Sequence, residues 1–291
     1  CIRAILIRDF ILVMCSKCYY LSGIILLLVR TSMQNQENIF DEDLIKCRQE
    51  RAKAQGFVSF LHDQVIADLK HRIYEQEKNF LNVAIIGPFA RYWGRSLPYK
   101  VCSFFEDEKI LPVKPGSRDL IISALYLHLV NDPIARLVQM RRGLKRNGVL
   151  FAYAFGENSL YELKKSFEYA ELEVFGRISC RVNPMVDIPT FGRLLRRAGF
   201  DHCVSDRLNY KVDYRDPMDL LSDIRGMGET NAMIERSRRP LSKKVLSYAM
   251  KYYRENYKTV KKNNKYQATF DVVCLTGWIS KPGSTNERIS R

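Results

Sequence analysis

The sequence has 291 residues, of which 46% are hydrophobic, and it carries 47 basic against 32 acidic side chains for a formal net charge of +15. A chain of this length can bury a large core, and its hydrophobic content excludes a predominantly disordered protein. The positive charge would suit a polyanionic partner. However, the cations are spread over many segments without regular aromatic interleaving, so we expect a basic solvated surface rather than nucleic-acid binding.

The eight cysteines indicate neither a disulfide framework nor a zinc site. Cys15 and Cys18 form one CxxC pair, but no second pair follows at zinc spacing, and the other cysteines stand alone. We therefore predict no bound metal. Isolated cysteines are typical of a reducing compartment, and the expected location is cytoplasmic.

Residues 1–32 are apolar and differ in character from the rest of the chain. The charge-free run Tyr19–Val29 is shorter than the ~20 residues of a membrane-spanning helix. Arg3 and Arg8, ahead of an apolar stretch, leave a signal peptide or membrane anchor as an alternative. Because Met33 begins a polar stretch, we favour an upstream extension outside the native fold, and we expect no membrane contact apart from this segment.

Two helices are predicted within residues 33–80. The first begins after Ile39, and Glu42 and Asp43 lie in its first turn, where the helix dipole favours acidic side chains. The second spans about Phe60–Tyr74 and carries apolar residues at three- and four-residue spacings. These helices precede the predicted sheet.

A buried strand is predicted over Leu81–Ile86, and the turn Gly87-Pro88-Phe89 follows it. A glycine in such a turn lets the backbone approach a nucleotide-type cofactor and offers free amide donors. Pro88 removes one donor, however, and Phe89 adds bulk where a close approach is needed. The turn is therefore either a cofactor loop or an ordinary connection from a strand to a loop.

Three carboxylates, Glu106, Asp107 and Glu108, follow a strand predicted over residues 100–105. At the carboxyl end of a parallel strand, a carboxylate can accept a hydrogen bond from a ribose hydroxyl or an adenine amino group. The alternative is a solvated acidic loop.

The central part of the chain predicts a strand, a helix and a second strand. The first strand covers Leu120–Leu125, Asp132-Pro133 begins the helix, Asn147-Gly148 ends it in a left-handed turn, and Val149–Phe155 is the second strand. A helical crossover makes two such strands parallel, so both carboxyl ends open onto one edge of the sheet, where α/β folds bind ligands. The candidate site therefore comprises the two strand ends, Ser123 to His128 and Ala154 to Glu157.

The remaining sequence predicts further helices and strands. Its helix-rich part at about 216–262 is expected to be an insertion in the sheet domain. The predicted helices are Ser159–Glu173, Thr190–Ala198, Pro217–Gly226 and Leu241–Tyr257, and the predicted strands are Asp201–Ser205, Leu208–Tyr214 and Thr269–Ile279. Gly199 is expected to cap one of these helices. We expect one layered α/β domain over 81–279 and a disordered tail over 280–291.

Several stretches together resemble a class I S-adenosylmethionine-dependent methyltransferase. They are similar to the branch that includes malonyl-carrier-protein O-methyltransferase and the mitochondrial arginine hydroxylase that assists assembly of respiratory complex I. The stretches that carry the resemblance include Leu127–Asp132, Leu144–Leu150, Phe155-Gly156 with Leu160–Leu163, Arg197–Phe200, Met227–Asn231 and Thr276–Trp278.

The resemblance implies a Rossmann-like class I methyltransferase sheet, mostly parallel with an antiparallel last strand, and S-adenosylmethionine bound over the carboxyl ends of the first strands. Gly87 would be the first glycine of the cofactor loop, and Asp107 with Glu108 would lie near adenine. Ser123 and Ala124 would lie at the strand end beside the reactive sulfonium. His128 is a candidate base, with a histidine at the edge of the core as the alternative.

The sequence departs from the family pattern at the cofactor loop. Ile85 stands where the family has an acidic residue, and Phe89 and Arg91 replace later glycines. About twenty residues separate Gly87 from Asp107, where the family has room for a full crossover helix. A strand-helix piece that would carry the ribose-binding carboxylate is therefore expected to be missing.

These observations leave two hypotheses for the function. The first is an S-adenosylmethionine-dependent methyltransferase with a protein acceptor or an acyl-carrier substrate. The second is a non-catalytic or hydroxylase-type assembly factor for respiratory complex I, with a complex I subunit as its partner.

Overall fold

The computed structural model describes residues 38–99, 102–106, 108–259 and 265–280. All described helices and strands belong to one compact unit, 40–291. The predicted extension over 1–32 lies outside the described residues, as does the predicted tail beyond Ser280.

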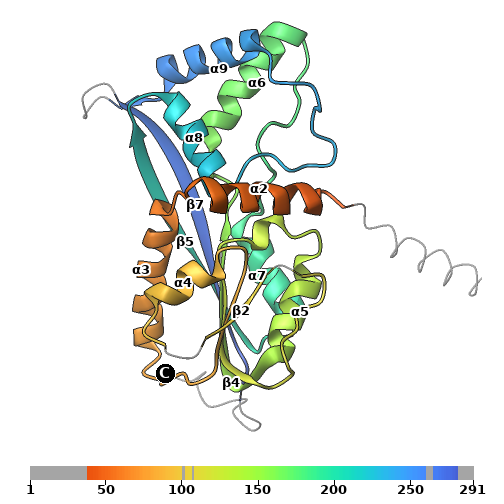
Figure 1. Cartoon of the computed structure of the whole chain (residues 1–291), viewed down its shortest axis with the longest axis vertical. Coiled ribbons are helices and arrows are strands. Elements are labelled where there is room, and N and C mark those ends of the chain that lie inside the picture. Colours follow the sequence, from red (N-terminus) through yellow and green to blue (C-terminus); the bar gives the residue numbers. More distant parts are fainter. Residues whose placement is uncertain (1–37, 100–101, 107, 260–264, 281–291) are drawn as a thin grey trace, which may run out of the picture. The chain divides into compact units, whose positions relative to one another are not determined.

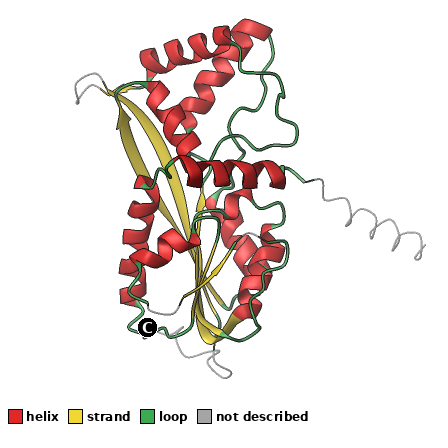
Figure 2. Cartoon of the chain, viewed as in Figure 1, coloured by secondary structure: helices red, strands yellow, loops and turns green. Residues whose placement is uncertain are grey.

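Seven described strands pair into one sheet: β1 (Val83–Ile86), β2 (Cys102–Phe105), β3 (Arg118–Ser123), β4 (Leu144–Phe155), β5 (His202–Tyr214), β6 (Lys258–Thr259) and β7 (Lys265–Trp278). Their order is β2-β1-β3-β4-β7-β5, with β6 also paired to β7. The long strands β5 and β7 lie side by side (Figures 1 and 2). The first four strands are parallel neighbours, and β7 runs antiparallel to β4, β5 and β6. The predicted Rossmann-like sheet, mostly parallel with an antiparallel last strand, is therefore confirmed.

The described helices cover both faces of this sheet. They are α2 (Glu42–Gln55), α3 (Phe60–Glu75), α4 (Ala90–Ser96), the short 3-10 helix η1 (Leu127–Leu129), α5 (Pro133–Gly143), α6 (Tyr161–Phe175), α7 (Ile188–Arg197), α8 (Pro217–Met227) and α9 (Lys243–Asn256). Successive side chains of a strand point to opposite faces. Ile85 and Ile122 accordingly pack with α3 and α4, whereas Ile86 and Ile121 pack with α5 and α7.

Helices α6, α8 and α9 gather at one end of the long β5–β7 pair (Figure 1). α8 and α9 follow β5 in the chain, and α9 packs against α6 through the rings of Tyr252 and Tyr169, whose centroids are 4.5 Å apart. In Figure 1, α2 crosses the molecule below this helical group, and it contacts α8.

The central strand-helix-strand unit has the predicted parallel geometry. Ile122 of β3 lies opposite Phe151 of β4, and the Asp132 side chain caps α5 by accepting from the backbone N–H of Ala135 at 2.9 Å. Pro133 occupies the first turn, where a missing N–H costs nothing. Local sequence signals therefore account for this unit.

The connection from α5 to β4 differs from the prediction. β4 begins at Leu144, directly after the helix, and the left-handed residue is Asn147 (φ 61°) rather than Gly148. Gly148 is needed for space instead, because a Cβ there would lie 2.7 Å from the carbonyl oxygen of Lys145. The predicted turn at Asn147-Gly148 is thus an irregularity within a strand, where the β3–β4 register also shifts.

The two strands predicted over 201–214 form the single strand β5. It pairs continuously with β7, and no turn separates its halves. Asp206 and Arg207 remain within the ladder because both side chains find distant partners. Asp206 pairs with Arg72 at 2.5 Å, and Arg207 pairs with Asp271 at 3.3 Å.

The connection between β1 and β2 is short. Among the described residues it contains only the seven-residue helix α4, and β2 forms the edge of the sheet. The chain then passes from β2 to β3 without a described helix. The expectation that a strand-helix piece of the family is missing here stays a prediction.

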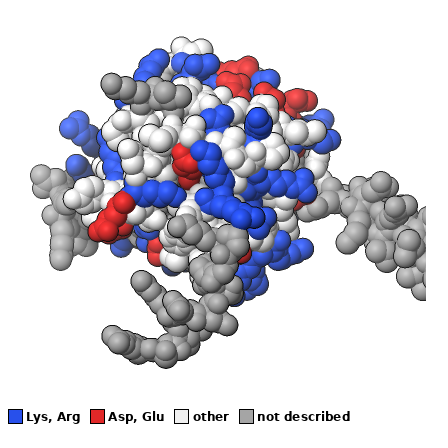
Figure 3. Space-filling model, turned by 90° about the horizontal axis from the view of Figure 1, so that it is seen from below, with Lys and Arg blue, Asp and Glu red and all other residues white. Residues whose placement is uncertain are grey.

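Many of the surface cations have a local structural reason. Lys and Arg cover much of the face seen from below in Figure 3, with fewer Asp and Glu among them. Arg141 and Arg142 lie in the last turn of α5, and Arg196 and Arg197 lie in the last turn of α7, where the helix dipole favours cations.

None of the described helices is long and apolar enough to cross a membrane.

Candidate functional site at the carboxyl edge of the sheet

The carboxyl ends of β1, β2 and β3 meet at one edge of the sheet. The backbone N–H of Gly87 donates to the Phe105 carbonyl at 2.9 Å, and the N–H of Ala124 donates to the Ile86 carbonyl at 2.8 Å. Gly87 has a φ of +135°, and a Cβ there would lie 3.0 Å from Tyr126 Cδ1 and 3.3 Å from the Ala124 carbonyl oxygen. Conformation and close approach both require glycine at this position.

The structure brings some of the predicted cofactor residues together. Gly87, Ser123 and Ala124 are neighbours at this edge, and all three are buried. Glu108 is exposed on the loop that leaves β2, and its backbone carbonyl accepts from Arg136 at 2.5 Å. Asp107 lies outside the described residues.

An aromatic cluster follows the glycine turn. Phe57, from the loop before α3, stacks on Phe89 with ring centroids 3.9 Å apart and an interplanar angle of 18°. Phe89 is only 6% exposed, and the edge of the His62 ring contacts both phenylalanines. The bulk that Phe89 adds to the turn is therefore packed into the core beside α3 and α4.

His62 of α3 and Trp93 of α4 belong to the same aromatic cluster as Phe57 and Phe89. The indole N–H of Trp93 donates to His62 Nδ1 at 2.9 Å, and both side chains are buried. Burial lowers the pKa of His62 to about 3, with a smaller contribution from His128, although the charge of Asp63 opposes this shift. His62 is therefore a neutral acceptor within the core near neutral pH.

The predicted base, His128, is held by two partners. Its Nδ1 accepts from the backbone N–H of Phe155 at 3.3 Å, so the ring proton belongs to Nε2, which lies 2.9 Å from Glu229 Oε2. The histidine side chain is fully buried, and that of Glu229 is 9% exposed. The pair joins η1 and the end of β4 to the segment after α8. A catalytic role for His128 stays a prediction.

Removing the Glu229 carboxylate is expected to destabilise the fold. Glu229→Ala leaves the buried His128 N–H without its acceptor, which costs about 1–3 kcal/mol of the free energy of unfolding. Glu229→Gln retains an acceptor oxygen and should recover most of this loss. Urea unfolding followed by tryptophan fluorescence measures both values. Glu235→Ala, at an exposed position nearby in the chain, is the control, and equal losses for Glu229→Ala and Glu235→Ala would contradict the expectation.

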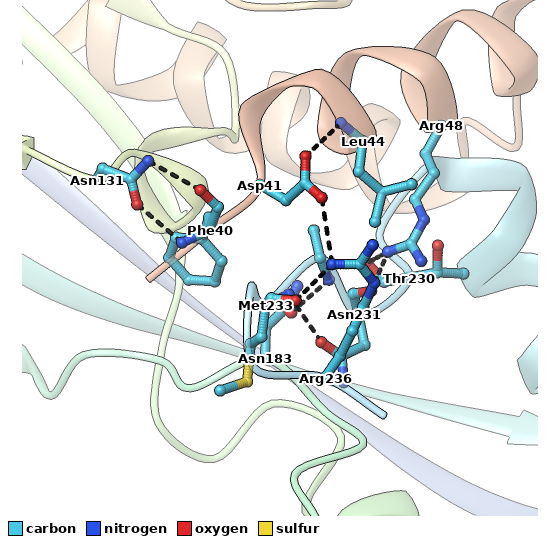
Figure 4. A network of polar contacts seen from close by, with 11 residues as sticks. Phe40, Asp41, Leu44, Arg48, Asn131, Asn183, Thr230, Asn231, Met233 and Arg236 are labelled. Atoms are coloured by element: carbon cyan, nitrogen blue, oxygen red, sulfur yellow. Dashed lines mark hydrogen bonds and ion pairs between the residues drawn. The ribbon is translucent and has the colours of Figure 1, made fainter. Parts of the chain in front are cut away.

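A polar network fixes the segment after Glu229 against α2 (Figure 4). A guanidinium nitrogen of Arg48 donates to the Thr230 carbonyl at 2.8 Å and also to the carbonyl of Asn231. The Ala232 carbonyl accepts from the backbone of Asp41 at 2.9 Å, and the Ala232 N–H donates to the Asn183 side chain at 3.0 Å. Sequence reasoning found the Met227–Asn231 stretch only through the family resemblance, and no local pattern indicated these partners.

Within the described residues, no three His, Cys, Asp or Glu side chains lie close enough together to hold a metal ion.

Comparison with known proteins identifies the family of this chain, although no protein-family model matches it. The human protein "Arginine-hydroxylase NDUFAF5, mitochondrial" is 31% identical over 268 residues, which cover 83% of this chain and 77% of the human protein. The chain belongs to the NDUFAF5 arginine-hydroxylase family. The malonyl-[acyl-carrier protein] O-methyltransferase of Gallionella capsiferriformans is 28% identical over 188 residues, covering 65% of this chain and 60% of that enzyme.

The predicted branch of class I methyltransferases is therefore confirmed, and this NDUFAF5-family chain is methyltransferase-like. A solved structure described as "a putative methyltransferase" from Bacillus halodurans matches with a TM-score of 0.42 and 11% identity, covering 70% of this chain and 93% of that one.

In this arrangement the ends of β1 and β3 offer no open space for S-adenosylmethionine. Ser123 and Ala124 are buried, and a Cβ at Gly87 would lie 3.0 Å from Tyr126 Cδ1. The Ser123 hydroxyl is buried without a hydrogen-bond partner among the described residues. A ligand over Gly87 and Ala124 would have to displace the side chains that bury them.

Proposed function

We propose that this NDUFAF5-family chain is an assembly factor that acts by binding a protein partner and does not use S-adenosylmethionine as a methyl donor. The observation that carries the proposal is the burial of the glycine turn, where Phe89 stacks on Phe57 and Tyr126 approaches Gly87. The short connection between β1 and β2 supports it, because the family places part of the cofactor site in that connection.

The family resemblance and the names of the relatives indicate which protein partner to expect. A subunit of respiratory complex I is the partner that the family resemblance implies, and an acyl-carrier protein is the alternative suggested by the name of the methyltransferase relative.

The names of the NDUFAF5 relatives carry the word "mitochondrial", which favours a mitochondrial location for this chain over the cytoplasmic one predicted from its cysteines. Fractionation of cells that express the tagged full chain would decide between the two compartments.

Calorimetric titration of the purified chain with S-adenosylmethionine and S-adenosylhomocysteine tests the proposal. We expect no binding heat at millimolar ligand from protein whose cooperative unfolding shows that it is folded. Phe89→Ala, which removes half of the aromatic stack, should bind no more weakly than the parent chain. A micromolar dissociation constant for the unmodified chain would contradict the proposal.

Arginine hydroxylation is a second candidate function, and it is favoured by the 31% identity to an arginine hydroxylase over most of the chain. If the chain has this activity, an arginine in a co-expressed partner should gain the mass of one oxygen atom. Peptide mass spectrometry of the partner, with and without the chain, measures this gain. An unmodified partner in both samples would contradict hydroxylation but would leave partner binding unaffected.

A further inference from the structure

A pocket of about 720 Å³ opens beside the network that holds the segment after α8. Its walls come from α2, α6, the loop after α6 and residues 230–241, and the glycine turn at the sheet edge does not line it. No part of the proposed function so far uses this pocket.

The pocket is lined by four arginines and a single carboxylate. The arginines are Arg48, Arg181, Arg236 and Arg238, and the carboxylate is that of Asp41. Such an excess of guanidinium groups in one concavity attracts anions and can bind carboxylates in a bidentate manner.

Structural contacts use only part of the hydrogen-bonding capacity of these arginines. Arg48 donates to two backbone carbonyls through one terminal nitrogen, and Arg236 donates to the Met233 carbonyl at 2.7 Å and contacts Asp41 at 3.2 Å, also through one nitrogen. Arg181 uses its Nε to bind Glu171 at 2.6 Å. In the described part of the chain, the remaining terminal nitrogens of all three have no partner. The side chains are thus held in place with donors left over.

The positive charge of the pocket is incompletely compensated. Burial, followed by repulsion from Arg236 and Arg51, lowers the pKa of the Arg48 guanidinium below its ordinary value, and the attraction of Asp41 does not offset this. A bound anion would relieve the repulsion between these cations.

Apolar side chains form the rest of the wall. Leu44 of α2, Phe167 of α6 and Leu241 line the same pocket. Phe167 is buried, whereas Leu241 is 38% exposed at the mouth. A ligand that matches this lining carries both a carboxylate and an adjoining apolar group.

We propose that the arginine pocket binds an acidic, partly apolar segment of a protein partner, with a carboxylate between Arg48, Arg236 and Arg238. The choice of a protein segment rests on the proposed function, whereas the preference for a carboxylate stands on the lining alone. Figure 4 shows Arg48 and Arg236 converging on the segment that joins the pocket to Glu229. Binding here would therefore clamp α2 against that segment.

The test uses the full chain and a fluorescent, blocked peptide in which glutamate and aspartate alternate with leucine and phenylalanine, followed by anisotropy. Arg238→Glu should weaken binding about tenfold, because it removes one charge-assisted contact and adds repulsion. Arg238 is exposed and has no partner among the described residues, so the substitution should leave the fold intact. Arg239→Glu is the matched control: it makes the same charge change at an exposed neighbour that does not line the pocket, and binding should change by less than about twofold.

Further arms of the same experiment identify the ligand chemistry. A peptide with glutamine and asparagine in place of the acids should not bind, and glutarate or inorganic phosphate should compete only weakly with the acidic peptide. Equal weakening by the two substitutions, or equal binding of the neutral peptide, would overturn the proposal. Strong competition by phosphate or glutarate would instead show a site for a free small anion and overturn the assignment to a protein segment. The cofactor titration can fail without affecting any of these results.

Discussion

Trp93→Ala is expected to lower the free energy of unfolding by about 3–5 kcal/mol, the range typical of removing a large buried aromatic side chain. Trp93 is fully buried between α3 and the sheet, and its ring lies 5.8 Å from that of Tyr153. The substitution also removes the donor to His62, so a buried nitrogen loses its partner. Chemical denaturation followed by far-ultraviolet circular dichroism measures the loss.

Two further variants separate cavity formation from the lost hydrogen bond. Trp93→Phe removes the N–H together with part of the ring system and leaves a smaller cavity than Trp93→Ala, so a loss of about 1–3 kcal/mol is expected. Trp278→Ala is the control, because this second tryptophan is partly exposed and donates to Gln76 near the end of β7. Equal destabilisation by Trp278→Ala and Trp93→Ala would contradict the expectation that the buried Trp93 contributes more to stability.

The second large effect is a loss of stability in mild acid caused by His62. In the unfolded chain a histidine takes up a proton near pH 6.5, whereas burial holds the pKa of His62 at about 3 in the folded protein. Its contribution is therefore fully present above about pH 6.5 and is lost as the pH falls from there toward 3. The unfolding free energy should drop by about 2 kcal/mol between neutral pH and about pH 5 on this account.

Comparison of two histidine variants isolates this contribution. His62→Gln can still accept from Trp93 but has no proton to take up, so its stability should depend less on pH over this interval. His71→Gln is the matched control, because the His71 side chain is 74% exposed. The expectation fails if the pH dependence of His62→Gln equals that of the unmodified chain while His71→Gln also leaves it unchanged.

Local signals in the sequence were sufficient for the core of the fold. The Asp132-Pro133 helix start, the branched apolar strands and the helical crossover predicted the parallel β3–α5–β4 unit that the structure contains. Parallel strands also align their carboxyl ends, so Gly87 and Ala124 were expected at one edge and lie there together. Backbone propensity and side-chain period act over a few residues, and for this reason they can be read from the sequence.

Long-range partners decided the features that the sequence did not predict. β5 continues through Asp206 and Arg207 because Arg72 and Asp271, both remote in the chain, neutralise them. The local pattern had instead predicted two strands, Asp201–Ser205 and Leu208–Tyr214. The left-handed backbone conformation expected from Gly148 occurs at Asn147. Gly148 is needed because its neighbours leave no room for a Cβ atom.

The sequence alone distinguished the apolar residues 1–32 from the rest of the chain. Only the tertiary structure determined which side chains surround the candidate site. Phe57 reaches Phe89 from another loop, His128 meets Glu229 from 101 positions away, and the arginine pocket joins α2, α6 and the segment after α8. The sequence alone predicted the sheet and the strand ends, because these follow from short apolar patterns and their spacing, and the family entered through a resemblance. Which side chains cover those ends depends on how distant helices pack, and only the folded chain brings them together.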